Sequence, residues 1–153
     1  GVKFEIPNTQ KLKLEGKVME LPCISEKASV EFSSLKESKY TDTLLTTQSA
    51  TAAFVSNKEK NPWLIVDLGA SERIRAVKIL NRSDGGKKHA KNMRVWLSND
   101  EQNWQEVFQA VEAQKEWTVS VNPAQSARYT KVGLVGPREL LTLKGLKIFG
   151  DVE

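Results

Sequence analysis

The sequence is poor in the residues and motifs on which most enzymes depend. Its 153 residues include one histidine and one cysteine, Cys23, so an internal disulfide is excluded. It contains no Gly-x-Ser-x-Gly, His-Glu-x-x-His or paired-cysteine metal motif. No two carboxylates are marked by their spacing as an acid/base pair across a cleft. We therefore expect no enzyme activity from this chain itself.

Long apolar segments and helical patterns are also missing. No apolar run approaches the ~20 residues that cross a bilayer, and no stretch sustains the period of a long amphipathic helix. The 23 basic and 19 acidic residues are interspersed, which is typical of a solvated surface. Because no basic stripe carries interleaved aromatic residues, we expect no nucleic-acid partner, and a membrane partner is not favoured.

What the sequence has instead is a series of short β-strand patterns separated by turn formers. The last pattern changes parity, which a β-bulge at Lys144-Gly145 would explain. About eight short strands with turns between them predict an all-β fold, a β-sandwich of jelly-roll type. The predicted strands lie near residues 28–33, 63–68, 74–80, 93–97, 104–107, 117–121, 128–134 and 141–148.

The patterns also divide the chain. Residues 1–22 read as a leading segment, which is either a hairpin of this domain or the end of a preceding domain. Residues 23–153 are expected to form one domain with a core of its own. The stretch 34–50 is rich in Ser, Thr and Lys and reads as a long surface loop.

The four tryptophans divide by strand parity. Trp63, Trp104 and Trp117 are expected in the core, because large aromatic side chains dominate burial. Trp96 has the opposite parity to its apolar neighbours, so it is expected to be exposed and available for stacking.

A polar loop follows the second of two apolar strands. It begins Asn81-Arg82-Ser83-Asp84-Gly85-Gly86 and places hydrogen-bonding side chains at a sheet edge. We interpret the strands as scaffold and this loop as the functional part. Two alternatives stay open: Arg82 could pair with Asp84 or Asp67 to pin the loop, and His89 could be a solvated surface histidine.

The order and spacing of these segments resemble the discoidin family. The resemblance covers about residues 23–150 and implies the galactose-binding-like jelly roll of coagulation-factor C domains, fucose lectins and family 32 carbohydrate-binding modules. Members bind sugars, phospholipid head groups or proteins. The matching segments are Trp63-Leu64-Ile65-Val66-Asp67-Leu68-Gly69, Ile74 to Asp84, Val95 to Trp104, Arg128-Tyr129, and Leu141 to Gly150.

The resemblance also implies a sugar site. In sugar-binding members the arginine of the Asn-Arg motif binds ring hydroxyls, and a polar residue seven positions later assists it; these correspond to Arg82 and His89. A guanidinium presents a rigid donor fork to neighbouring hydroxyls, and an imidazole nitrogen can accept or donate. The other candidate contacts are Asp84, Lys88 and Asn92 in the same loop, Tyr40, Phe54 or Trp96 as a stacking aromatic, and Arg138 and Glu139 in a facing loop.

A structural calcium is a further implication of the resemblance. Many members hold Ca²⁺ with an Asp-Gly turn and a glutamate near the last strand. Here Asp42 lacks the following glycine, and Gly145 stands where the glutamate would align. Since calcium takes about six to eight oxygens, we expect no required cofactor, with calcium at Asp42 possible. The cysteine pair of many animal members is absent, which favours a bacterial module.

Two hypotheses follow. The first is a monomeric, non-catalytic carbohydrate-binding module that tethers a secreted or periplasmic glycan-active parent enzyme to galactose, N-acetylhexosamine or fucose type sugars, with acidic uronic polymers also open. The second is a protein- or membrane-docking domain, or a structural spacer in a multidomain enzyme. Its membrane version would use Leu44-Leu45, which resemble the apolar loop tips of membrane-binding members.

Overall fold

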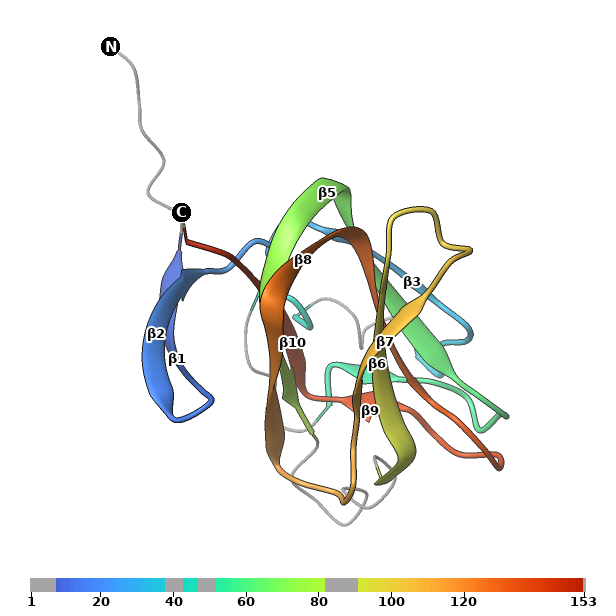
Figure 1. The fold of residues 1–153 in the computed structure, drawn as a ribbon. Helices are drawn as coiled ribbons and strands as arrows, with labels where there is room; N and C mark the ends of the chain where they lie inside the picture. Colours follow the sequence, from blue (N-terminus) through green and yellow to red (C-terminus); the bar gives the residue numbers. More distant parts are fainter. Residues whose placement is uncertain (1–7, 38–42, 47–51, 82–90, 153) are drawn as a thin grey trace.

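The computed structural model describes residues 8–37, 43–46, 52–81 and 91–152 of the chain. Their regular elements are β-strands joined by loops (Figure 1). No helix within these ranges is long and apolar enough to span a membrane. The strands are β1 (Thr9–Leu14), β2 (Lys17–Pro22), β3 (Ser29–Phe32), β4 (Phe54–Val55), β5 (Trp63–Leu80), β6 (Met93–Ser98), β7 (Gln105–Gln109), β8 (Glu116–Leu134), β9 (Thr142–Leu143) and β10 (Gly145–Gly150).

Two long strands, β5 and β8, give the fold its shape. They pair antiparallel along their length, and the register breaks between Asp67 and Glu72 and again between Ile74 and Ala76. At the first break Gly69 has a φ of 84°, a conformation that favours glycine. The paired strands arch over at this point (Figure 1), so that each contributes to two layers.

The partners of β5 and β8 define the two layers. Before the arch, β5 pairs with β3 on one side and with β8 on the other; β8 in turn pairs with β6, and β6 pairs with β7. Beyond the arch, β5 pairs with β10 and with the first part of β8. The short strands β4 and β9 form a separate pair. All pairings are antiparallel. The all-β jelly-roll sandwich predicted from the sequence is confirmed.

The main core lies between the layers and comes from alternate residues of the long strands together with buried residues of the connections. In β6, Met93, Val95 and Leu97 are buried while Arg94 and Trp96 are only partly buried, as the two-residue period of a strand requires. The side chains that fill the core include those of Leu64, Val66, Ile79, Trp117, Val132 and Ile148.

The hairpin of β1 and β2 packs on the outside of the β5–β10 layer. It closes a second, smaller core, and its turn is held by the carboxylate of Glu15, which accepts hydrogen bonds from Ser120 Oγ and Asn122 Nδ2 at 2.9 Å each. These bonds lower the pKa of Glu15. A division of the chain at residue 22 stays a prediction. The second core consists of Leu12, Leu14, Leu21, Cys23, Ala76 and Phe149.

Several sequence predictions are wrong in this part of the molecule. Leu44 and Leu45 are buried in the main core, at 0% and 7% exposure, and so cannot form an exposed membrane-binding tip. Phe54 is also fully buried and cannot stack on a sugar. The parity change near Gly145 is no bulge: β9 ends there, and β10 begins with a different partner strand.

Candidate functional site

The predicted polar loop leaves the end of β5 through a well-anchored residue. Asn81 is 2% exposed; its Nδ2 donates to the carbonyl oxygen of Gln114 and its backbone N–H to that of Lys115, both at 2.8 Å. Asn81 therefore fixes where the loop starts. Arg82, Asp84, Lys88 and His89 lie outside the described residues, and so do Tyr40 and Asp42.

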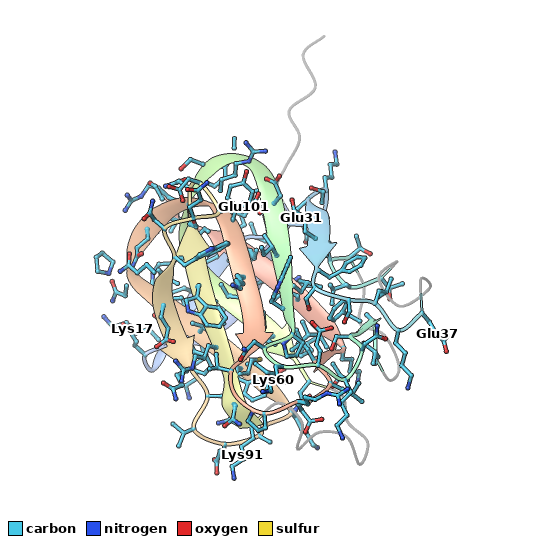
Figure 2. The ribbon with its side chains drawn as sticks, turned by 90° about the vertical axis from the view of Figure 1, so that its right-hand side faces the viewer. Lys17, Glu31, Glu37, Lys60, Lys91 and Glu101 are labelled. Carbon is cyan, nitrogen blue, oxygen red and sulfur yellow. The ribbon has the colours of Figure 1, made fainter. Side chains whose placement is uncertain are left out.

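The residues just before β6 lie beside a second connection, the one that follows β8. Asn92 is exposed, and its carbonyl oxygen accepts a hydrogen bond from the backbone N–H of Val135 at 3.4 Å. Lys91 and Lys60 lie at the lower end of the molecule in Figure 2. We refer to residues 57–61, 81, 91–92 and 135–140 as the loop end of the sandwich.

Arg138 and Glu139 belong to this end, and their hydrogen bonds join the connection 135–140 to the connection 57–61. Glu59 and Glu139 exchange two backbone hydrogen bonds of 3.2 and 3.0 Å, and the guanidinium of Arg138 donates to the carbonyl oxygen of Lys58 at 3.1 Å. Asn61 Oδ1 accepts from the backbone N–H of Gly136 at 3.0 Å. Arg138 stays exposed while making its bond, so a ligand could reach it.

Trp96 lies on a different surface, the outer face of the sheet that contains β5, β6 and β8. It is partly exposed as predicted, and Lys131 Nζ lies 5.1 Å from its ring centroid. Trp63 and Trp104 surround the same ammonium group at 5.9 and 5.2 Å. Both are partly exposed on this face, so the prediction that Trp63 and Trp104 lie in the core is wrong. Trp117 is buried in the main core, as predicted.

Sequence reasoning missed Lys131 and Gly133 on that face. The signal was present: Val132 and Leu134 point into the core, so their neighbours Lys131 and Gly133 must point outward in a regular strand. Which outward residues would meet across strands depends on register, and the register becomes known only from the structure.

Asp67, one of the partners considered for Arg82, is held by another residue. Arg128 Nε and Nη2 donate to its two carboxylate oxygens at 2.8 and 3.1 Å, and the backbone N–H of Gly69 donates to Oδ1 at 2.8 Å. The hydrogen bonds from Arg128, against the opposing effect of burial, keep the pKa of Asp67 below its usual value. This contact pins the arch of β5 to β8.

Replacement of Asp67 by asparagine is expected to lower the melting temperature near neutral pH and to have less effect in acid. The folded state lowers the pKa of this carboxyl, so its ionised form stabilises the fold above its unfolded pKa of about 3.9, and this contribution is lost as the pH falls through the lower folded value. Thermal unfolding of wild type and Asp67→Asn between pH 2 and 7 measures it.

The exposed ion pair of Glu106 with Arg94, at 3.0 Å, provides the matched control. We expect Glu106→Gln to change the melting temperature little at any pH, because exposed pairs contribute little. A deficit in Asp67→Asn that is the same at every pH would contradict the assignment.

A metal centre does not emerge from the described part of the chain. Those residues contain no group of three or more His, Cys, Asp or Glu side chains that could hold a metal ion. Calcium at Asp42 stays a prediction, because that residue lies outside the described ranges.

Comparison with known proteins gives one family match. The model of the F5/8 type C domain matches residues 26–139. No curated protein sequence matches the chain. Among solved structures, the lectin domain of lectinolysin, in complex with Lewis B antigen, is 26% identical with a TM-score of 0.73, over 84% of this chain and 96% of that one.

Two further structures share the fold. A fucose binding module of Streptococcus pneumoniae is 19% identical with a TM-score of 0.75, over 86% of this chain and 96% of that one. Chitosan-binding module 1, derived from a chitosanase/glucanase of Paenibacillus sp. IK-5, is 19% identical with a TM-score of 0.67, over 84% and 98%. The family match spans most of the jelly roll, and this chain belongs to the F5/8 type C domain family, as its resemblance to discoidin domains predicts.

Proposed function

We propose that this protein is a non-catalytic carbohydrate-binding domain whose ligand is held at the loop end. The observation that carries the proposal is the similarity to the lectin domain of lectinolysin, which reaches 26% identity over 84% of this chain and was solved with a bound glycan antigen. In the sequence a polar stretch lies between Asn81 and Asn92, and the hydrogen bonds of these two residues go to Gln114, Lys115 and Val135, which directly flank the two ends of β8. Loops on a rigid scaffold favour binding roles.

The chemistry of this end suits sugar hydroxyls. Arg82 would donate to neighbouring ring hydroxyls, and His89 would accept from or donate to a third. Asp84, Lys88 and Asn92 add further polar groups within the same loop, and exposed Arg138 adds one from the facing connection. We propose neutral sugars of the galactose, N-acetylhexosamine or fucose type as ligands.

The physiological role we propose is tethering. One structural neighbour was derived from a chitosanase/glucanase, which supports attachment of such modules to glycan-active enzymes. Linked to a secreted or periplasmic bacterial enzyme as a monomeric module without a required cofactor, the domain would raise the local concentration of substrate around the catalytic domain. Calcium at Asp42 is a separate prediction.

Replacement of Arg82 by alanine is expected to weaken sugar binding about tenfold to 100-fold. The physical reason is the loss of hydrogen bonds from a charged donor, worth about 1.5–3 kcal/mol. A glycan array identifies the ligand, and calorimetry with that glycan compares wild type with the variant.

The control for this experiment is Arg73→Ala. Arg73 is an exposed arginine on β5 that lies 3.8 Å from Asp151, next to the arch and at the opposite end of the sandwich from the loop end. Its loss should leave affinity unchanged. Unchanged affinity in Arg82→Ala would move the site elsewhere, and a domain that binds no glycan at all would favour the docking or spacer hypothesis.

A further inference from the structure

The outer face of the sheet formed by β3, β5, β8, β6 and β7 carries a cluster of aromatic side chains around one lysine. We call it the tryptophan face; it consists of Trp63, Trp96, Trp104 and Lys131. The Nζ atom of Lys131 lies 5.9, 5.1 and 5.2 Å from the three ring centroids, and all four side chains are partly exposed. Figure 2 looks onto this sheet.

Strand register brings the cluster together. Lys131 in β8 is paired with Trp96 in β6, and two residues along the strand Gly133 is paired with Trp63 in β5. A Cβ atom at Gly133 would lie 3.3 Å from Trp63 Cβ and 3.3 Å from Trp96 Cζ3. The glycine therefore leaves the space in which the two indoles close over β8.

The ammonium group of Lys131 has no anionic partner among the described residues. None of the hydrogen bonds or ion pairs within those ranges involves it, and burial alone lowers its pKa. The carboxylate of Glu106, which is paired with Trp96 across β6 and β7, is bound to Arg94 at 3.0 Å instead. A lysine that is fully buried almost always has a partner, and the need for one grows as burial removes water from the ammonium group.

The ring faces take the place of that partner. An ammonium group within about 6 Å of an indole centroid is attracted by the negative face of the ring. This attraction uses no N–H bond of the lysine in a conventional hydrogen bond, so each N–H bond that is not directed at a ring stays available to an incoming anion.

The two ends of this sheet differ in charge, because the loop end carries the basic residues Lys58, Lys60, Lys91 and Arg138 against the acidic residues Glu59 and Glu139. In Figure 2, Glu31 and Glu101 lie close together at the upper end, whereas Lys60 and Lys91 lie at the lower end. An anionic ligand on the tryptophan face would thus be repelled from the upper end and attracted toward the lower one.

We propose that the tryptophan face is a second saccharide-binding surface, selective for sugar units that carry an anionic group. The apolar faces of the pyranose rings would pack on the indoles, and the carboxylate or sulfate would accept hydrogen bonds from Lys131 Nζ. This surface acts independently of the loop end.

Binding of acidic oligosaccharides to the full chain tests the proposal. The probes are tetragalacturonate, a sulfated carrageenan tetrasaccharide, and the carboxyl-reduced, neutral form of the first. We expect at least one acidic probe to bind about tenfold or more tightly than the neutral one, with an affinity that falls as salt is added. The probe that binds identifies the anion as carboxylate or sulfate.

Variants locate the binding site. Lys131→Met and Trp96→Ala are expected to weaken binding of the acidic probe about tenfold or more, while Lys131→Arg retains most of it because the positive charge remains. Lys147→Met, which removes a partly buried lysine from β10 in the other layer, is the matched control and should bind normally. Circular dichroism and thermal melting of each variant confirm that it is folded.

The result also separates this proposal from the loop-end site. Arg82→Ala should bind the acidic probe like wild type. Failure of every acidic probe to bind at about 10 mM, or equal binding by wild type and folded Lys131→Met, would overturn the second surface whatever happens at the loop end. Loss of acidic binding in Arg82→Ala would also overturn it, because both ligands would then share the loop end.

Discussion

Deletion of residues 1–22 is expected to lower the free energy of unfolding of the remaining chain by more than about 4 kcal/mol. The hairpin contributes three leucines to the second core, and they are 4%, 2% and 0% exposed. Removal of one buried leucine side chain costs about 2–5 kcal/mol. The deletion removes all three and exposes Phe149 and Ala76 on β10 and β5, so the loss should be large.

Urea unfolding of the chain with and without residues 1–22 measures this effect. Leu14→Ala should lose about 2–5 kcal/mol by itself, and Val18→Ser in the same hairpin should change little because Val18 is 69% exposed. If residues 23–153 were as stable as the full chain, the hairpin would be no part of this folding unit, and residue 22 would mark a true domain boundary.

Gly133→Ala is expected to destabilise the protein by about 1–3 kcal/mol, because the added methyl group enters filled space. The new Cβ would lie 2.9 Å from the backbone carbonyl oxygen of Pro62 and 3.3 Å from atoms of Trp63 and Trp96. Backbone and paired indoles cannot yield as easily as the end of a flexible side chain. Equilibrium unfolding measures the loss, and tryptophan fluorescence reports displacement of the indoles.

Gly145→Ala is a matched control for this substitution. Its Cβ would also come within 2.9 Å of a neighbour, but that neighbour is the terminal Cδ1 of Leu80, which can rotate away. We expect a smaller loss of stability and an unchanged fluorescence spectrum. Equal losses in the two variants, or no change of fluorescence in Gly133→Ala, would contradict a close packing of Trp63 and Trp96 over β8.

The sequence predicts this fold well where periodicity and burial agree. In β6 the buried residues alternate with Arg94 and Trp96, so strand, orientation and face follow from the pattern alone. The same holds for Trp117, because in this part of β8 buried residues alternate with the more exposed Thr118 and Ser120. The arch at Gly69 is less predictable, because the periodicity predicts two separate strands where the structure has one bent strand, Trp63–Leu80.

Prediction fails where tertiary contacts override local composition. Leu44 and Leu45 stand in a polar stretch, yet they fill the core below β10, where Leu44 accepts a backbone hydrogen bond from Leu146 at 3.0 Å. Trp63 and Trp104 are large and apolar, yet they lie on the surface of the sheet, where their rings contact the ammonium group of the outward-facing Lys131. Neither outcome follows from residue type alone, because each depends on a segment distant in sequence.

The sequence locates the candidate site more coarsely than the fold. The structure brings Asn92, Arg138 and Glu139 to the loop end, and places Trp96 on the tryptophan face instead. Binding roles for these residues stay predictions. Arg82 and His89 rest on the family resemblance, since no strand or core contact of the described residues determines where a long loop directs its side chains.

The most direct test of carbohydrate binding at the loop end is chemical-shift mapping of the full, ¹⁵N-labelled chain. L-fucose, galactose and N-acetylgalactosamine are titrated in turn while backbone amide resonances are recorded. The proposed function predicts that at least one of these sugars shifts resonances of residues 81–92 and 135–140 and leaves those of the β5–β8 arch unchanged. No shift with any of the three, or shifts confined to residues outside 57–61, 81–92 and 135–140, would contradict it.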